Sequence, residues 1–227
     1  MDNLPISSNN SMSQQFTEEL LNPSVDLAVD YSEIYIDDLI QNETLNEIPI
    51  VKTVIGIIKT GISINNFFFV KKLLSFIREF NTGKISKDKK EEFQKKILED
   101  SKFRKKVTEQ IMVCLDRFND VNKAIILANL FKAFVDEKIS YEKFVFISIA
   151  MERLHPHSYS FFAKLEKIDY KIDHKNEDVR DSDSESLLLS SGLATEAPSD
   201  WWRGFTLKKE GVLLYEFGIK PLLKIDK

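Results

Sequence analysis

The sequence is poor in the residues that interrupt regular structure. Its 227 residues include only 7 Gly and 6 Pro, and Cys114 is the single cysteine. So few turn-forming residues, together with a charged fraction of 30%, favour helices. One cysteine excludes an intrachain disulfide and is typical of a reducing compartment. The sequence therefore predicts a mainly α-helical protein that has no disulfide framework.

Motifs that identify catalytic or cofactor sites are also missing. The sequence has no Gly-x-Ser-x-Gly elbow, no Gly-rich phosphate loop and no dinucleotide-binding fingerprint. His155 and His157 flank a proline and lack a second cluster of metal ligands, and Cys114 has the apolar neighbours of a buried cysteine. We therefore expect a protein that is not an enzyme and uses no metal, cofactor or small-molecule substrate.

Positive charge is absent from the N-terminal part of the chain. Residues 1–51 contain ten Asp or Glu and no Lys or Arg, whereas residues 52–170 contain 23 basic and 15 acidic side chains. We predict an acidic, partly disordered N-terminal arm over residues 1–47, beside a basic body. Two interpretations stay open. Either the arm acts on the body, by docking onto it through Asp37 and Asp38 or by keeping other anions away from it, or it is a solubilising tail.

Residues 1–15 do not resemble a secretory signal. They are polar, and they contain neither a basic residue nor an apolar segment. We expect the protein to be cytoplasmic. If it acts on a membrane, we expect it to bind the inner membrane peripherally.

The most apolar stretch of the chain covers residues 48–80. Polar residues recur there at every third or fourth position up to Ser63, and Lys52 and Lys59 belong to this narrow stripe. Asn65 and Asn66 then separate two helices, so a helical hairpin is predicted. Its apolar face comprises Ile50, Val54, Ile55, Ile57, Ile58, Ile62, Phe67 and Phe68.

This apolar face has two interpretations. In the first, the hairpin is the buried centre of a helical core. In the second, it enters a membrane or binds a partner when a trigger exposes it. A permanent single span is not expected, because Lys52 and Lys59 would each cost about 2.5–3.5 kcal/mol near the bilayer centre.

Further helices are expected after the hairpin, and two of them begin in a repeated segment. Phe80-Asn-Thr-Gly-Lys-Ile-Ser86 recurs as Phe134-Val-Asp-Glu-Lys-Ile-Ser140, which predicts one helix–turn–helix unit used twice. A helix over 102–118 has Val113 among its apolar residues, and a helix from Tyr141 to about Arg153 has Phe146 and Ile149. The helical core domain is placed at 48–168.

The C-terminal part differs in composition. Residues 169–185 are dense in charge and are predicted to be a linker. Residues 186–227 are predicted to form a small α+β module that resembles the closing half of a winged helix, with a strand from Trp201 to Phe205 and Thr206 capping the next helix. Trp201 and Trp202 are a candidate binding patch. DNA binding is disfavoured, because the segment in the place of a reading helix is acidic.

Several segments of the central body carry a family resemblance. They are SEI at 32–34, IPIVKT at 48–53, GISI at 61–64, KKLLSFI at 71–77, LDRFNDVNKA at 115–124 and LFKAF at 130–134. On these segments the chain resembles a family of bacterial helical proteins that are similar, in size, helical body and terminal module, to Abi-alpha-type abortive-infection proteins. The resemblance implies antiphage defence and no enzyme chemistry, and it assigns no site residue.

The expected function is thus that of a non-enzymatic defence or regulatory protein. Its apolar hairpin would be exposed on triggering and would act on a membrane or on a partner protein, with self-association as a further way of burying it. The alternative is a protein-binding or DNA-binding regulatory module in which the hairpin is purely structural.

Overall fold

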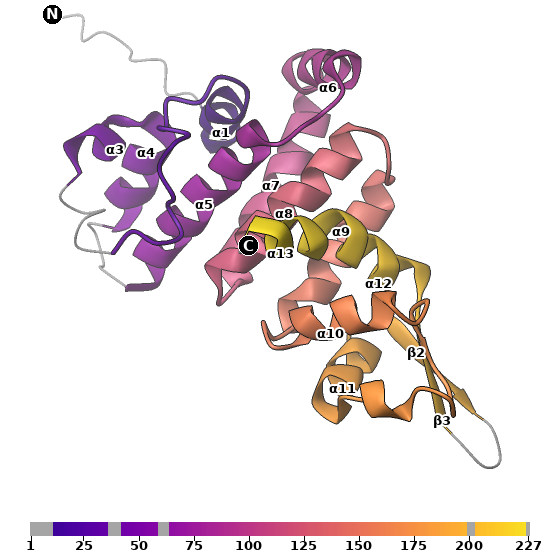
Figure 1. Ribbon diagram of the computed structural model, residues 1–227. Coiled ribbons are helices and arrows are strands. Elements are labelled where there is room, and N and C mark those ends of the chain that lie inside the picture. Colours follow the sequence, from indigo (N-terminus) through magenta and orange to yellow (C-terminus); the bar gives the residue numbers. More distant parts are fainter. Residues whose placement is uncertain (1–10, 36–41, 59–63, 199–202, 226–227) are drawn as a thin grey trace, which may run out of the picture.

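The computed structural model describes residues 11–35, 42–58, 64–198 and 203–225, and it confirms a mainly helical fold with a small antiparallel sheet near the C-terminus (Figure 1). The α-helices are α1 (Met12–Leu21), α3 (Glu43–Glu47), α4 (Pro49–Ile58), α5 (Ile64–Thr82), α6 (Lys87–Glu99), α7 (Ser101–Arg117), α8 (Val121–Val135), α9 (Tyr141–Ala150), α10 (Ser158–Glu166), α11 (Ser182–Ser190), α12 (Lys209–Leu213) and α13 (Lys220–Ile225).

The first helix belongs to the core. Ser11 and Gln14 form a capping box that starts α1, and the helix ends at Leu21, two positions before Pro23. Phe16 and Leu20 are fully buried, and the ring of Phe16 lies 6.1 Å from that of Phe76 in α5. Part of the segment that the sequence assigns to an acidic arm therefore packs inside the helical body.

The centre of the core is formed by α5 and α8, which lie side by side (Figure 1). Phe131 of α8 is fully buried, and its ring lies 5.9 Å from Phe76 and 5.3 Å from Phe80, both in α5. Phe93 of α6 and Phe144 of α9 each approach Phe131 to 5.5 Å. Four helices thus meet at one aromatic ring.

The repeated segment forms the predicted unit twice, as α5–turn–α6 and α8–turn–α9. The two turns also touch, because the backbone N–H of Ser86 donates to Oδ1 of Asp136 at 2.9 Å. Ser140 caps α9 by accepting the N–H of Lys143, whereas the Ser86 side chain makes no such bond. The two copies therefore share their backbone course and differ in how their second helix begins.

One ion pair joins the two central helices in a largely buried place. Nζ of Lys132 in α8 lies 2.7 Å from Oε1 of Glu79 in α5 and donates to the Glu79 carbonyl at 3.0 Å. Gly83 leaves room for this lysine, because an added Cβ there would come within 2.1 Å of its Nζ. The pair fixes α8 against the last turn of α5.

The sheet has the strand order β1-β3-β2, with β1 at Lys171–Ile172, β2 at Ala194–Pro198 and β3 at Arg203–Leu207. Lys171 pairs with Thr206, and Ala194 pairs with Leu207. Residues 169–185, predicted to be a linker, contain β1, a 3-10 turn (Glu177–Val179) and the first turn of α11. The fully buried Ile172 ties this segment into the core.

Two expectations in this part were wrong. The predicted strand ended at Phe205, but β3 continues to Leu207, and the predicted start at Trp201 lies outside the described residues. Thr206 was expected to cap a helix, but it pairs with Lys171 and Thr195 inside the sheet, and Lys208 precedes α12 instead. Thr has a high β propensity, and Thr206 lies in the central strand with a paired strand on each side, so it is a strand residue and not a helix cap.

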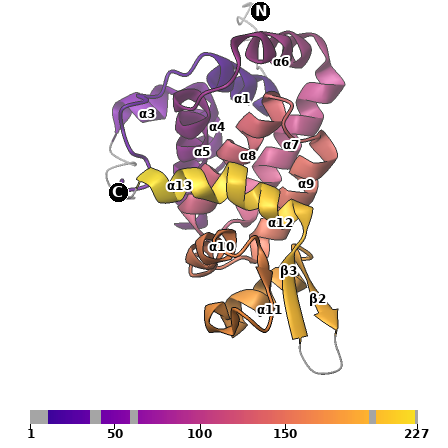
Figure 2. The same cartoon turned by 45° about the vertical axis from the view of Figure 1, so that its right-hand side comes forward.

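After the sheet the chain returns to the helical body (Figure 2). A π-helical segment (Leu214–Ile219) continues α12 and leads into α13. Gly218 allows this segment to approach α8 closely, because an added Cβ would lie 2.8 Å from Ile126 and 3.2 Å from Leu130. Asn129 donates to the Gly218 carbonyl at 3.4 Å. The C-terminal part is thereby packed on the same core as α5.

Candidate functional site

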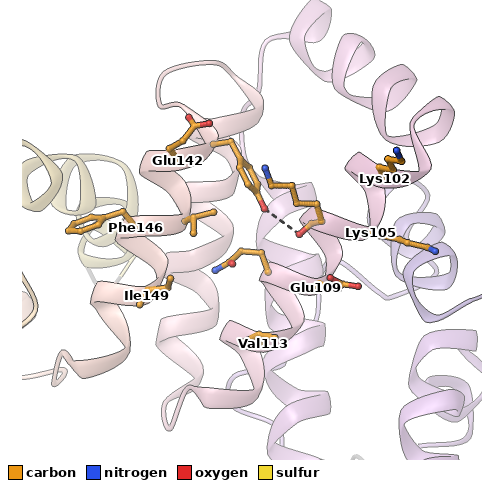
Figure 3. Close-up of a pocket in the computed structure, with 11 residues that line it drawn as sticks. Lys102, Lys105, Glu109, Val113, Glu142, Phe146 and Ile149 are labelled. Atoms are coloured by element: carbon orange, nitrogen blue, oxygen red, sulfur yellow. Dashed lines mark hydrogen bonds between the residues drawn. The ribbon is translucent and has the colours of Figure 1, made fainter.

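An open groove of about 950 Å³ lies between α7 and α9 (Figure 3). One wall is α7 and the other is α9. The lining residues are Lys102, Lys105, Lys106, Glu109, Gln110 and Val113 from α7, and Tyr141, Glu142, Val145, Phe146 and Ile149 from α9.

The two walls run in the same direction. Near the start of both helices, the hydroxyl of Tyr141 donates to the Lys106 carbonyl at 3.2 Å. One to two turns further along each helix, the Gln110 side-chain amide donates to the Ser148 hydroxyl at 3.2 Å. Each helix is capped at its N-terminus, α7 by Asp100 and α9 by Ser140. The start of each wall is thereby fixed.

The far half of the groove is apolar and exposed. Val113, Phe146 and Ile149 are 48%, 47% and 52% exposed, although residues of these types are usually buried. They are three of the seven exposed large hydrophobic side chains in the described parts of the chain, and they line one cavity. Such a concentration of apolar surface is typical of a binding site.

The near half of the groove is basic. Lys102, Lys105 and Lys106 are exposed, and Lys106 lies over the ring of Tyr141, with Nζ 4.4 Å from its centre. Lys102 and Lys105 form no ion pair with any carboxylate in the described ranges. Two unneutralised positive charges therefore stand at one end of an apolar groove.

Two carboxylates also line the groove. Hydrogen bonds from its own backbone and from Ser140 hold the pKa of Glu142 below its usual range, and the charge of Lys106 acts in the same direction. Glu142 is thus committed to the first turn of α9, where a negative charge is favourable. Glu109 lies on α7 between the lysines and Val113 (Figure 3).

The one cysteine near the groove is not available for reaction. Gln110 lines the cavity and donates to Sγ of the buried Cys114 at 3.3 Å. Burial raises the pKa of the Cys114 thiol, which keeps it in the unreactive protonated form. What the lining residues offer is apolar contact, hydrogen bonding and charge, with three lysines against two glutamates. These properties suit binding.

The structure places the first residues of the sequence-predicted apolar face in the core. Ile50 is fully buried and Val54 nearly so, in α4, which packs against α1, α3 and α5. Phe67 is partly buried, whereas Phe68 is 43% exposed near the start of α5. Lys52 of the polar stripe is exposed and pairs with Glu47 at 3.4 Å.

Other predicted residues lie outside what the structure describes. These are the side chains of Ile55, Ile57 and Ile58, together with Asp37, Asp38, Lys59, Ile62, Trp201 and Trp202 in full. In the described ranges, no helix has the combination of length and apolar character needed to cross a bilayer.

His155 and His157, considered in the sequence as possible metal ligands, belong to no group of three or more potential ligands among the described residues. His157 is exposed, and its Nε2 lies 3.4 Å from Oδ2 of Asp181 at the start of α11. Nδ1 of His155 accepts the backbone N–H of His157 at 3.2 Å. Both side chains are thus part of the turn that precedes α10.

Sequence reasoning missed the groove, because it counted Val113, Phe146 and Ile149 among ordinary apolar helix residues. Helical spacing carries a usable signal. In α7 the buried Ile111 and Cys114 are three apart, and in α9 the buried Phe144 and Ile147 are three apart. The three exposed residues are off those positions by one or two, which places them on a second face of each helix.

Comparisons of the chain with protein-family models, with curated proteins and with solved structures give no match.

Proposed function

We propose that the protein is a non-enzymatic regulatory protein that binds a partner protein in the groove between α7 and α9. The observation that carries this proposal is the gathering of Val113, Phe146 and Ile149 in one exposed cavity. Burying apolar surface contributes about 25 cal/mol per Å² before the entropic cost of association is subtracted, so covering three half-exposed side chains works in favour of a bound partner. An aromatic residue with aliphatic neighbours is a common arrangement at the centre of protein interfaces.

Site-specific photocrosslinking in the native host tests this function. A photoreactive amino acid at position 149 should crosslink one defined protein, and replacing Val113 by Glu in the same chain should abolish that product. The crosslinked protein, once purified, should bind wild type and lose at least tenfold in affinity for Val113→Glu.

Leu98 provides the matched control position, because it is an exposed large apolar residue on α6 outside the groove. A crosslink at position 98 to the same protein, or a product at 149 that persists in Val113→Glu, would contradict the proposal.

A second candidate function retains the apolar hairpin as the effector, in the abortive-infection setting that the family resemblance implies. Two observations favour it. Phe68 is exposed on α5, and α4 is covered by the N-terminal helices α1 and α3. Thr53 of α4 donates to the Gln15 side chain of α1 at 2.8 Å. A trigger that displaced α1 would uncover Ile50 and Val54.

Vesicle flotation tests this second candidate with the full chain and anionic lipid. Phe68→Asp should reduce vesicle binding without unfolding the protein, since the side chain is already exposed. Asp37→Lys with Asp38→Lys should increase binding if the arm is a latch. Absence of wild-type binding under all conditions would exclude the hairpin as a membrane effector.

For the C-terminal part, we propose a winged-helix-like module that contacts protein in preference to DNA. The element order α10, β1, α11, β2, β3 and the sheet order β1-β3-β2 support the winged-helix comparison. Asp183 is exposed in the first turn of α11 and would be repelled by phosphate. A gel-shift measurement with random duplex DNA at low salt should show no binding.

A further inference from the structure

The proposed function leaves open what kind of segment the groove accepts. Resting on that function, we propose that the occupant is an amphipathic helix of about three turns, with apolar residues along one face and acidic residues at the end that lies over Lys102 and Lys105. Three properties of the walls lead to this occupant: their hydrogen bonding, their length and their charge.

Hydrogen bonding favours a helix over an extended peptide. Both walls are α-helices, whose interior N–H and C=O groups are already paired with one another. An extended peptide in the groove would find no ladder of backbone partners, and its own polar groups would be left unpaired on burial. A helix satisfies its backbone internally and needs only side-chain contact from the walls.

The length of the groove sets the size of the helix. Val113 follows Lys102 by eleven positions on the α7 wall, a rise of roughly 16 Å along the helix axis. Three turns of a docked helix cover about the same distance. Its apolar residues would then recur at every third or fourth position and face Val113, Phe146 and Ile149.

Charge determines which end of the bound helix carries the acidic residues. Lys102 and Lys105 form no ion pair with a carboxylate in the described ranges, and Lys106 beside them lies over the ring of Tyr141. These three lysines outnumber the two glutamates of the lining, Glu109 and Glu142. Acidic side chains at that end of the docked helix would pair with these lysines and speed the encounter. The opposite end meets only Val113, Ile149 and their apolar neighbours, so acidic residues gain nothing there.

A display library of random 16-residue peptides tests this without assuming a partner. Selection uses the full-length wild-type protein, and binders that also bind Val113→Glu/Ile149→Glu are discarded. We expect the remaining peptides to carry apolar residues at helical spacing and acidic residues at one end. Each selected peptide is then synthesised, and its circular dichroism should become helical on binding.

Charge reversal tests the placement of the acidic end. Lys102→Glu/Lys105→Glu should weaken the selected peptides by about tenfold or more. Lys171→Glu/Lys175→Glu is the control, because it makes the same change in net charge with two exposed lysines outside the groove. Only the first variant should also flatten the salt dependence of binding.

The outcomes separate this inference from the function on which it rests. Groove-dependent peptides that are extended, basic, or equally affected by both lysine variants would overturn the acidic helix and leave partner binding standing. A library that yields no peptide sensitive to Val113→Glu/Ile149→Glu would overturn both.

Discussion

Lys132 and Glu79 form an ion pair between the two central helices, in a place that water reaches poorly. Their side chains are 12% and 11% exposed, and the two charged atoms are 2.7 Å apart. Removing one partner of such a pair leaves the other charge in a poorly hydrated place, which costs more than the pair itself contributes.

Glu79→Ala should therefore lower the free energy of unfolding by about 3 kcal/mol. Glu79→Met with Lys132→Met should recover most of that loss, because it removes both charges together. Denaturant unfolding measures each value. Glu91→Ala is the control, since Glu91 pairs with Lys87 on the exposed face of α6 and should change stability by about 0.5 kcal/mol or less. Equal losses for Glu79→Ala and Glu91→Ala would contradict this account of burial.

Tyr215 gives the fold a dependence on alkaline pH. Its hydroxyl donates to Oε2 of Glu166 at 2.7 Å, and its side chain is buried. Burial, with the hydrogen bond to Glu166 acting in the same direction, raises the pKa of Tyr215 from 10.0 to about 12. The folded state thus holds this proton more tightly than the unfolded state does.

The higher pKa of Tyr215 in the folded state contributes to the free energy of unfolding. This contribution is fully present below pH 10, and it is lost as the pH rises towards about 12. Tyr215→Phe should make the free energy of unfolding fall less steeply across that interval. Urea titrations at successive pH values measure the slopes. A Tyr215→Phe slope equal to that of wild type would mean that other groups carry the alkaline dependence.

At the level of elements, α7 and α9 each have two apolar faces, one buried in the core and one exposed in the groove. The face of α7 with Ile111 and Leu115 is fully buried, and so is the face of α9 with Phe144 and Ile147. The second face of each helix is exposed in the groove. Because only the first pair of faces supports the fold, the two faces should respond differently to substitution.

Ile111→Ala should cost about 2–5 kcal/mol of stability, because it leaves a cavity in the core. Val113→Glu and Ile149→Glu should each change stability by less than about 1 kcal/mol, since both side chains are half exposed. Thermal unfolding compares the three variants. A large loss for Val113→Glu would place Val113 in the core and remove the basis of the groove.

α9 also connects the groove to the C-terminal part. Lys143 pairs with Glu210 of α12 at 3.3 Å, and the ring of Phe146 lies 3.7 Å from where a Cβ on Gly192 would stand. Gly192 has a φ of +77°, which its position after α11 requires. A helix bound in the groove would thus contact α9, the same helix that contacts α12 and Gly192 of the C-terminal part.

For the whole molecule, the central question is whether α1 can leave the body. Phe16 is fully buried against Phe76 of α5, so α1 shares the core with α5 and α8. A core that shares its side chains in this way is expected to unfold in one cooperative step.

Phe16→Ala should therefore lower the stability of the whole chain by about 3–5 kcal/mol, in a single transition seen equally by circular dichroism and by hydrogen exchange. Under the second candidate function the result differs. Early exchange confined to residues 12–21, with the remaining helices still protected, would show that α1 is a detachable cover.

Much of the architecture was predictable from local pattern. Few Gly and Pro, helical spacing and the repeat of Phe80–Ser86 as Phe134–Ser140 predicted the helical body, and the fold confirms it. These features depend on backbone preference and on contacts between residues close in sequence, and a single chain displays both. The predicted roles of Asp37, Asp38, Trp201 and Trp202 stay predictions.

Tertiary structure decided the rest. Lys171–Ile172 became a strand only because β3, more than thirty residues away, offers it hydrogen-bonding partners. Ile50 and Val113 are both aliphatic residues on helices, yet the first is in the core and the second in the groove. Helical periodicity shows which face of a helix an apolar residue lies on. Which face is covered depends on the helices that pack against it, and those contacts are set by distant parts of the chain.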